Sequence, residues 1–321
     1  MAASQSALAP STVHTPVRRF ERCEAALQAM AGYEAELHQN ALRRRSNGFT
    51  VTDQDQPAEV FCLFPPRPVQ PPLALIGGMG PLAGAMAFRR ACERFRNSRA
   101  VVLYQACFMP DRSTIILSGG GPGTPMCRDI AWRLADAVRF AAGLSGLAAR
   151  CIIACNSAHY FWRLLEDELR QTAPRGGCEV QMISLVNSTL HALKLGAFKF
   201  QSSRKTLVLA ADGARVGQVF TAPFQDAGIA FEEPSPALSR LLMRAIFEGV
   251  KALDDRRAVE LGNEFFENVL ATGRDYDYVL AGCTELPLLI DILRRRGSPT
   301  VAAFLSRARI VDPLEEALAR A

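Results

Sequence analysis

Short apolar runs alternate with amphipathic segments along most of the 321-residue chain, and this alternation constrains the fold more than any other feature. The runs are LALIGG (73–78), AVVLYQACF (100–108), ARCIIAC (149–155), EVQMISL (179–185), KTLVLAA (205–211) and YDYVLAGC (276–283). Segments between them, such as 125–144 and 235–253, carry apolar residues at helical spacing. Apolar strands alternating with helices are typical of parallel sheets covered on both faces. The sequence therefore predicts an α/β fold.

A weak internal repeat indicates that this fold has two similar lobes. LALIGGMG at 73–80 is echoed by LVLAADGA at 207–214, and RCIIACNSAH at 150–159 by YVLAGCTEL at 278–286. The two separations, 134 and 128 residues, are nearly equal. Strand–turn and strand–cysteine units that recur in the same order predict two parallel sheets flanked by helices. Two lobes that face each other leave a cleft, which is the usual place for a ligand.

The chain is expected to divide into an N-terminal extension and the two lobes. Residues 1 to about 20 are rich in Ala, Ser, Thr and Pro, which predicts disorder, and residues 20–45 show helical spacing. The stretch FPPRPVQPP at 64–72 has five prolines in nine residues and is interpreted as the end of a linker. We expect an extension over 1–72, a first lobe over 73–183 completed by a C-terminal helix at 306–321, and a second lobe over 184–305.

Composition and charge exclude several classes of protein. The net charge of +5 comes without a dense basic block beyond two arginine triplets, so no nucleic-acid partner is expected. No apolar run approaches the ~18 residues of a membrane span, and the N-terminus lacks the apolar core of a secretory signal. Nine scattered cysteines favour reduced thiols over a disulfide scaffold. Together these features predict a cytoplasmic location and no membrane association.

The glycine-rich turn after the first apolar run is a candidate ligand-binding loop. Gly78, Gly80 and Ala83 fit a loose form of the dinucleotide fingerprint, but the acidic residue that should follow, Asp111, comes too late. No Lys-Ser/Thr pair follows the glycines, so the turn is not a P-loop. A structural turn, a nucleotide loop and a small-anion site remain open on this stretch alone.

Two cysteines stand in matched contexts. Cys155 ends one apolar run and Cys283 ends another, and polar residues that can cap a helix follow each of them: Asn156 or Ser157, and Thr284. Each thiol is therefore expected at the carboxyl end of a parallel strand and at a helix N-terminus. Ligands bind at such strand ends, and helix N-termini lower the pKa of a thiol. The pair is a candidate for proton transfer.

Other cysteines and the polar residues near the pair can be ordinary structural residues. Cys151, Cys155 and His159 have C-x3-C-x3-H spacing, but a strand rises about 3.3 Å per residue, so the two thiols lie too far apart to share a metal ion. No metal site is predicted. His159 is interpreted either as a donor behind Cys155 or as an ordinary helix residue. Arg112 follows the proline-containing turn in FMPDRST (108–114) and is a candidate for binding a carboxylate.

Taken together, these motifs resemble the aspartate/glutamate racemase superfamily, and its aspartate racemase branch most. The resemblance rests on IGGMGPLAG (76–84), PDR (110–112), ACNSAHYF (154–161), GCTELPLL (282–289) and VDP (311–313). It implies a racemase of acidic amino acids that works without pyridoxal phosphate or any other cofactor. Cys155 and Cys283 would be the acid/base pair, one from each lobe. The substrate-binding residues would be Gly78, Met79, Gly80, Arg112, Asn156, Ser157, Thr284 and Glu285. Family members are often dimers, which makes a homodimer an expectation.

The sequence departs from the family pattern at the start of the second lobe. The family has a hydroxyl-rich loop there, whereas this chain has Ala211, Ala214, Gly217 and Phe220. The choice between aspartate, glutamate and another acid therefore stays open. So do two alternatives: a different two-cysteine reaction such as maleate-type isomerisation, in which one thiol is a nucleophile, and a ligand-binding protein without activity. The sequence assigns no role to residues 1–72.

Overall fold

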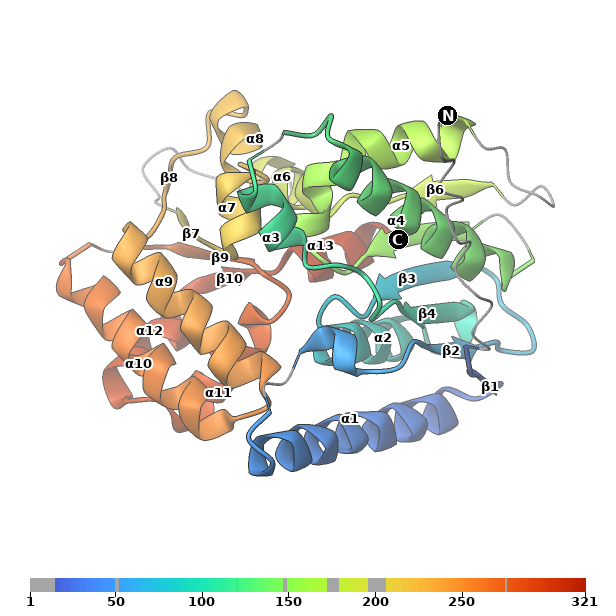
Figure 1. Ribbon diagram of the computed structural model, residues 1–321, viewed down its shortest axis with the longest axis horizontal. Coiled ribbons are helices and arrows are strands. Elements are labelled where there is room, and N and C mark those ends of the chain that lie inside the picture. Colours follow the sequence, from blue (N-terminus) through green and yellow to red (C-terminus); the bar gives the residue numbers. More distant parts are fainter. Residues whose placement is uncertain are drawn as a thin grey trace, which may run out of the picture.

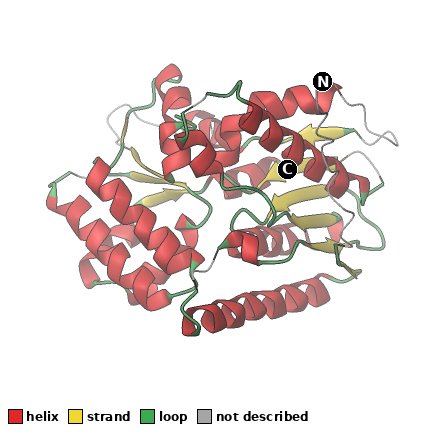
Figure 2. Cartoon of the chain, in the orientation of Figure 1, coloured by secondary structure: helices red, strands yellow, loops and turns green. Residues whose placement is uncertain are grey.

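Two α/β lobes lie side by side in the computed structural model, each built on its own sheet (Figures 1 and 2). The structure describes residues 15–49, 52–119, 121–146, 149–171, 179–195, 206–274 and 276–321. No helix in these ranges is long and apolar enough to cross a membrane. The expected α/β fold with two lobes is confirmed.

The first sheet has six strands in the order β1-β2-β4-β3-β5-β6. Their bounds are Val17–Phe20 (β1), Glu59–Leu63 (β2), Leu73–Gly77 (β3), Val101–Gln105 (β4), Ala149–Ile153 (β5) and Val180–Met182 (β6). Strands β4, β3, β5 and β6 run parallel, as the apolar runs predict. Strand β2 pairs antiparallel with β4, and β1 pairs parallel with β2. The sheet is therefore mixed at the edge that the N-terminal extension supplies.

The second sheet has four strands in the order β10-β9-β7-β8, all parallel. Their bounds are Thr206–Ala210 (β7), Phe231–Glu232 (β8), Tyr278–Gly282 (β9) and Arg309–Val311 (β10). The repeat seen in the sequence has a structural counterpart: β3 pairs with β5 in the first lobe as β7 pairs with β9 in the second. In both lobes the strand that leads into a turn and the strand that ends at a cysteine are neighbours.

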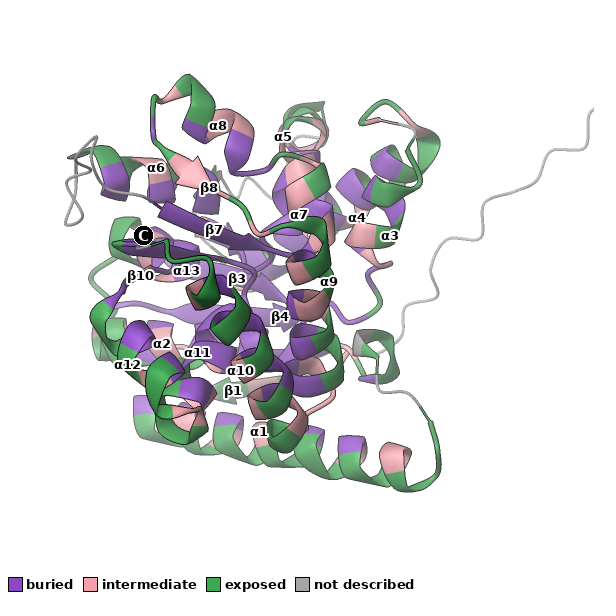
Figure 3. Ribbon diagram, turned by 90° about the vertical axis from the view of Figure 1, so that its left-hand side faces the viewer, coloured by how far each residue is buried: buried purple, intermediate pink, exposed green. Residues whose placement is uncertain are grey.

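Helices cover both faces of each sheet. Around the first sheet lie α1 (Cys23–Ser46), α2 (Pro81–Phe95), α3 (Arg112–Leu117), α4 (Pro125–Gly143) and α5 (Trp162–Gln171), with 3-10 turns η1 (Asp53–Asp55), η2 (Arg96–Ser98) and η3 (Ser157–Phe161). The rest of the chain adds α6 (Leu185–Leu195), α7 (Asp212–Val216), α8 (Thr221–Asp226), α9 (Pro236–Arg244), the π-helix η4 (Ala245–Lys251), α10 (Asp255–Ala271), α11 (Leu286–Arg296), α12 (Pro299–Arg307) and α13 (Pro313–Arg320). Successive residues of each central strand enter opposite core clusters, so both faces are buried (Figure 3).

The N-terminal extension is more ordered than its composition indicates. Of the segment predicted to be disordered, residues 1–14 lie outside the described residues, and the prediction is wrong for Val17–Phe20, which form β1. The helical spacing of residues 20–45 corresponds to one helix, α1. Strand β2 lies inside the segment interpreted as linker, where all five of its residues are buried. The division of the chain into domains stays a prediction.

The C-terminus connects the two lobes. Strand β10 pairs with β9 in the second sheet, whereas Leu314, Ala317 and Leu318 of α13 pack into the core cluster that β3 and α2 share. The last residues of the chain therefore cross from the second lobe back to the first.

Candidate active site

The glycine turn after β3 brings the first lobe against two neighbours. Gly78 has φ +82°, and a Cβ there would approach the backbone of Cys107 to 2.6 Å, so only glycine fits. Gly80 has φ +140° and faces the carboxylate of Glu285, which leaves no room for a side chain. Met79, between them, is buried and lines the central cavity described next. Gly78 faces the residues directly after β4, and its expected contact with substrate stays a prediction.

A single cavity between the lobes holds both candidate thiols. The space enclosed within it is about 30 Å³, room for one or two water molecules. Cys155 follows β5 and Cys283 follows β9, and the two side chains are 6% and 8% exposed. The first lobe lines this cavity with Met79, Asp111, Arg112, Ser113, Cys155, Asn156 and Ser157; the second lobe with Ala211, Ile246, Phe247, Lys251, Cys283, Thr284 and Glu285. A cavity of this size leaves no room for a dinucleotide.

Beside Cys155, the amide of Asn156 is buried and unpaired. Asn156 precedes the 3-10 turn η3, but its side chain makes no capping hydrogen bond, which corrects the expectation that Asn156 or Ser157 caps a helix. Both its Oδ1 and its Nδ2 are buried without a hydrogen-bond partner among the described residues. A buried amide left unpaired costs about 1–3 kcal/mol. This arrangement is typical of a group that pairs with a ligand.

His159 supports the backbone near Cys155 and does not touch its thiol. Its Nε2 accepts a hydrogen bond from the Leu185 N–H at 3.0 Å, so its Nδ1 donates to the Cys155 carbonyl at 3.0 Å. The ring stacks on Trp162. Burial lowers the pKa of His159 to about 4, against the opposing effect of its backbone hydrogen bonds with Cys155 and Asn156. Both nitrogens are occupied, so the residue is no metal ligand here.

Beside Cys283, the residue that organises the site is Glu285. The Cys283 thiol donates to Glu285 Oε2 at 2.9 Å, and the Thr284 hydroxyl donates to the same oxygen at 3.2 Å. Thr284 was expected to cap the following helix, but α11 begins at Leu286 with no side-chain cap. The carboxylate of Glu285 is almost fully buried at 2% exposure. It is a hydrogen-bond acceptor placed directly at the thiol.

The Cys283 thiol does not have the lowered pKa that a helix N-terminus predicts. Burial raises the pKa of Cys283 well above its ordinary value, and the charge of Glu285 raises it further. The backbone N–H of Glu285 and the ammonium of Lys251 lower it by less. The expectation fails because burial of the thiol, and after it the charge of Glu285, outweighs the effect of the helix terminus. Cys283 therefore favours its protonated thiol form.

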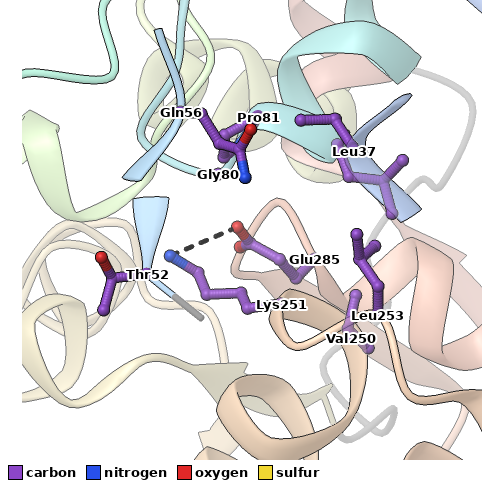
Figure 4. A pocket seen from close by; sticks show the side chains of 10 residues that line it. Leu37, Thr52, Gln56, Gly80, Pro81, Val250, Lys251, Leu253 and Glu285 are labelled. Atoms are coloured by element: carbon purple, nitrogen blue, oxygen red, sulfur yellow. Dashed lines mark ion pairs between the residues drawn. The ribbon is translucent and has the colours of Figure 1, made fainter. Parts of the chain in front are cut away.

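Lys251 is a site residue that sequence reasoning missed. It ends the π-helix η4, and its ammonium lies 3.7 Å from Glu285 Oε1, with both side chains largely buried. Figure 4 shows this ion pair with Gln56 and Thr52 around it. One signal was available: the chain has four lysines against 33 arginines, so a lysine in an apolar segment is unusual.

Arg112 lines the cavity but is engaged by the protein itself. Its guanidinium donates to the carbonyls of Met79 at 3.1 Å and Pro110 at 2.9 Å. These bonds tie the glycine turn to the loop that begins α3. Arg112 was expected to grip a carboxylate; the described contacts assign it first to holding the cavity wall.

The departures from the family pattern in the second lobe mostly lie away from the cavity. Ala214 and Phe220 are buried in the core cluster around β7, and Gly217 packs against the ring of Tyr160. Of these positions in the described structure, Ala211 alone is among the residues that line the cavity. The lost hydroxyls therefore change the cavity wall at one position.

Comparison with known proteins agrees with this fold. A family model described as Asp/Glu/Hydantoin racemase matches residues 76–321. The chain belongs to this family. The structure is similar to that of a Picrophilus torridus aspartate racemase, with 19% identity, a TM-score of 0.56 and coverage of 78% of this chain and 92% of that one. It is also similar to a Yersinia pestis protein thought to be an Asp/Glu racemase, with 15% identity, a TM-score of 0.53 and coverage of 78% and 97%.

Membership of the Asp/Glu/hydantoin racemase family places most of the cavity inside the shared unit. The match begins at Ile76, within β3, so it includes the glycine turn, Arg112, both thiols and Glu285. Strands β1 and β2 and helix α1 precede it. At these identities the structural likeness shows the fold, and the family and fold together point to a racemase.

Proposed function

We propose that the protein is a cofactor-independent racemase of an acidic amino acid, with Cys155 and Cys283 as its two bases. The observation that carries the proposal is that two nearly buried thiols, each from the equivalent strand end of its lobe, line one cavity. A reaction with an equilibrium constant of one needs an acid and a base for each enantiomer. The paired thiols supply both roles from the two lobes.

Racemisation would exchange the protonation states of the two thiols. The thiolate of one cysteine takes the Cα proton, and the C–H electron pair remains on the substrate as a planar carbanion delocalised into the carboxylate. The other thiol donates its proton to the opposite face of Cα. In one direction Cys155 is the base and Cys283, whose raised pKa favours the thiol form, is the acid. For the reverse direction, Glu285 Oε2 stands 2.9 Å from the Cys283 sulfur and can accept its proton.

The polar groups around the cavity suit a substrate that has two carboxylates and an ammonium group. The unpaired amide of Asn156 can both donate to a carboxylate and accept from an ammonium. The ammonium of Lys251 provides a positive charge near Cys283, which favours a carboxylate and the carbanion that forms beside it. These groups fit aspartate or glutamate.

The test follows the Cα proton. The protein is incubated in D2O with L- or D-aspartate and L- or D-glutamate, and Cα deuteration and chirality are recorded. Removing one thiol should reduce racemisation about 10²–10⁴-fold, the usual worth of a positioned acid or base. C155A and C283A should each still exchange the Cα proton of one enantiomer, because each keeps one base. The two variants should act on opposite enantiomers.

The matched control is C92A, which removes a buried thiol from the first-lobe core, far from the cavity lining. It should racemise like the unaltered chain. Folded protein that deuterates none of the four amino acids would refute the proposal. A covalent adduct on Cys155 with an unsaturated diacid would instead identify a nucleophilic isomerisation.

A further inference from the structure

Helix α1 of the N-terminal extension reaches from the first lobe to the second. It runs beneath the first lobe, and its C-terminal end lies beside the second lobe (Figure 1). Near its start, Cys23, Ala26 and Met30 pack into the first-lobe core. In its last turn the guanidinium of Arg45 donates to the carbonyls of Ala252 and Leu253, at 3.2 Å for Leu253. The extension is therefore bonded to the second lobe at one defined point.

That point is the end of the helix that carries Lys251. Helix η4 ends at Lys251, and Ala252 and Leu253 are the next two residues. Carbonyls at a helix C-terminus lack partners within the helix, and a basic side chain satisfies them. Arg45 does so from a different part of the chain, 207 residues earlier. Its contact fixes the backbone directly after the site lysine.

Leu253 anchors the same turn by packing. Its φ is +56°, a conformation that a leucine adopts only when its surroundings hold it. Its side chain packs against the core cluster that includes Leu37 of α1. Leu37 and Leu253 together line a second cavity that also reaches Lys251 and Glu285. The extension thus contacts both the backbone and the side chain of this turn.

The chain beyond α1 continues along the site. Gln56, which is 8% exposed, and Thr52 line the cavity around the Lys251–Glu285 pair, and Figure 4 shows Gln56 directed toward that pair. The segment is held by Asp55, which pairs with Arg44 at 3.0 Å and accepts from the Thr52 hydroxyl at 2.8 Å. The four residues of the extension named in this paragraph precede the start of the family match at residue 76.

We propose that the N-terminal extension is a working part of this active site, and that Arg45 is a positioning residue for Lys251. By holding the two carbonyls after η4, Arg45 keeps the ammonium beside Glu285 and the substrate. The proposal rests on the proposed racemase function for its kinetic readout, but the placement of Lys251 can be measured without turnover. The extension lies outside the residues that the family model matches, so family membership alone does not assign it this role.

The experiment is a double-mutant cycle between R45A and K251A. Losing a hydrogen bond from a charged donor is worth roughly a tenfold change, so R45A should raise KM for the acidic substrate about tenfold with kcat changed less. The double variant R45A/K251A should be no worse than K251A alone, because Arg45 acts through Lys251. R43A is the matched control, since Arg43 lies in the same turn, is exposed, and bonds only to Asn40 among the contacts of its side chain in the described residues.

A second readout works even if the chain has no racemase activity. Alkylation of Cys283 by iodoacetamide, followed by mass spectrometry across pH, reports the thiol pKa. Lys251 lowers that pKa, so R45A and K251A should both move the alkylation midpoint to higher pH, and R43A should not. R45K, which keeps a donor for the carbonyls, should lie between R45A and the unaltered chain.

Additive effects of R45A and K251A on KM and on the alkylation midpoint would overturn the proposal. So would an R45A variant that behaves like R43A in both. If R45A makes the core thiols Cys92 and Cys151 reactive, the fold has loosened. The cycle is then run with R45K in place of R45A. Additive effects with K251A, or behaviour like that of R43A, would again overturn the proposal.

Discussion

His159 is a buried histidine whose role is structural, and its burial makes a pH dependence of stability predictable. In the folded chain its pKa is about 4, against an ordinary 6.5. As pH falls from about 6.5 to about 4, the unfolded chain binds a proton that the folded chain does not. Stability is therefore greatest above pH 6.5 and should fall by about 3 kcal/mol across this window on account of His159.

The measurement is urea unfolding between pH 7 and pH 4 for the unaltered chain and for H159Q. Glutamine can still accept from the Leu185 N–H but does not titrate. The difference in free energy of unfolding between the unaltered chain and H159Q should narrow as the pH falls. Two curves that stay parallel would show that His159 does not titrate as its burial implies.

The carboxylate of Glu285 should govern the reactivity of Cys283. Its charge is a main cause of the raised pKa of that thiol, after burial. E285Q removes the charge and keeps the shape, so the pKa of Cys283 should fall and its alkylation should begin at lower pH. Cys155 in the same molecule is the internal control, because among the described residues it is the Cys283 thiol, and not that of Cys155, that donates to Glu285. An unchanged alkylation midpoint for Cys283 would argue against Glu285 as the acceptor of its proton.

At the scale of elements, the sequence predicts those parts of the fold that hydrophobic pattern determines. Each of the six apolar runs contains a strand, and the strands before Cys155 and Cys283 are neighbours of the turn strands as the repeat indicates. Such runs are recognisable because both faces of a parallel sheet are buried. The two-residue strand β8 and the short edge strand β10 lack that signal, since side chains such as Arg309 remain exposed.

The elements that escaped prediction are those fixed by tertiary contacts. Strand β2 reads EVFCL, five residues beside a proline-rich stretch, and it becomes a strand by pairing with β4. The π-helix η4 has the same apolar periodicity as an ordinary helix, yet its wider turn ends at Lys251. Motif resemblance therefore identifies the thiols, while Lys251 and the role of the extension depend on contacts between distant segments.

At the scale of the whole molecule, the cavity exists because two lobes are held at a fixed separation. Arg45 joins them at the base, and α13 crosses between them. At the mouth, α3 meets α7, where the Gly213 N–H donates to Ser113 Oγ at 3.3 Å. A Cβ at Gly213 would lie 2.8 Å from Ser113 Cα, which is backbone that cannot move aside without shifting α3. The missing side chain at this glycine is what lets the lobes meet.

Gly213→Ala should therefore push α3 away from α7 and widen the cavity beside Arg112, which begins α3. Overpacking of this kind costs about 1–3 kcal/mol, so both the melting temperature and the affinity for substrate should fall. Gly32→Ala is the matched control: it also lies within a helix, but no atom lies within 4 Å of its added Cβ. In the middle of α1 that substitution should raise stability by about 0.5–1 kcal/mol and leave KM unchanged. Equal effects of the two substitutions on KM would mean that the contact between α3 and α7 does not set the separation of the lobes.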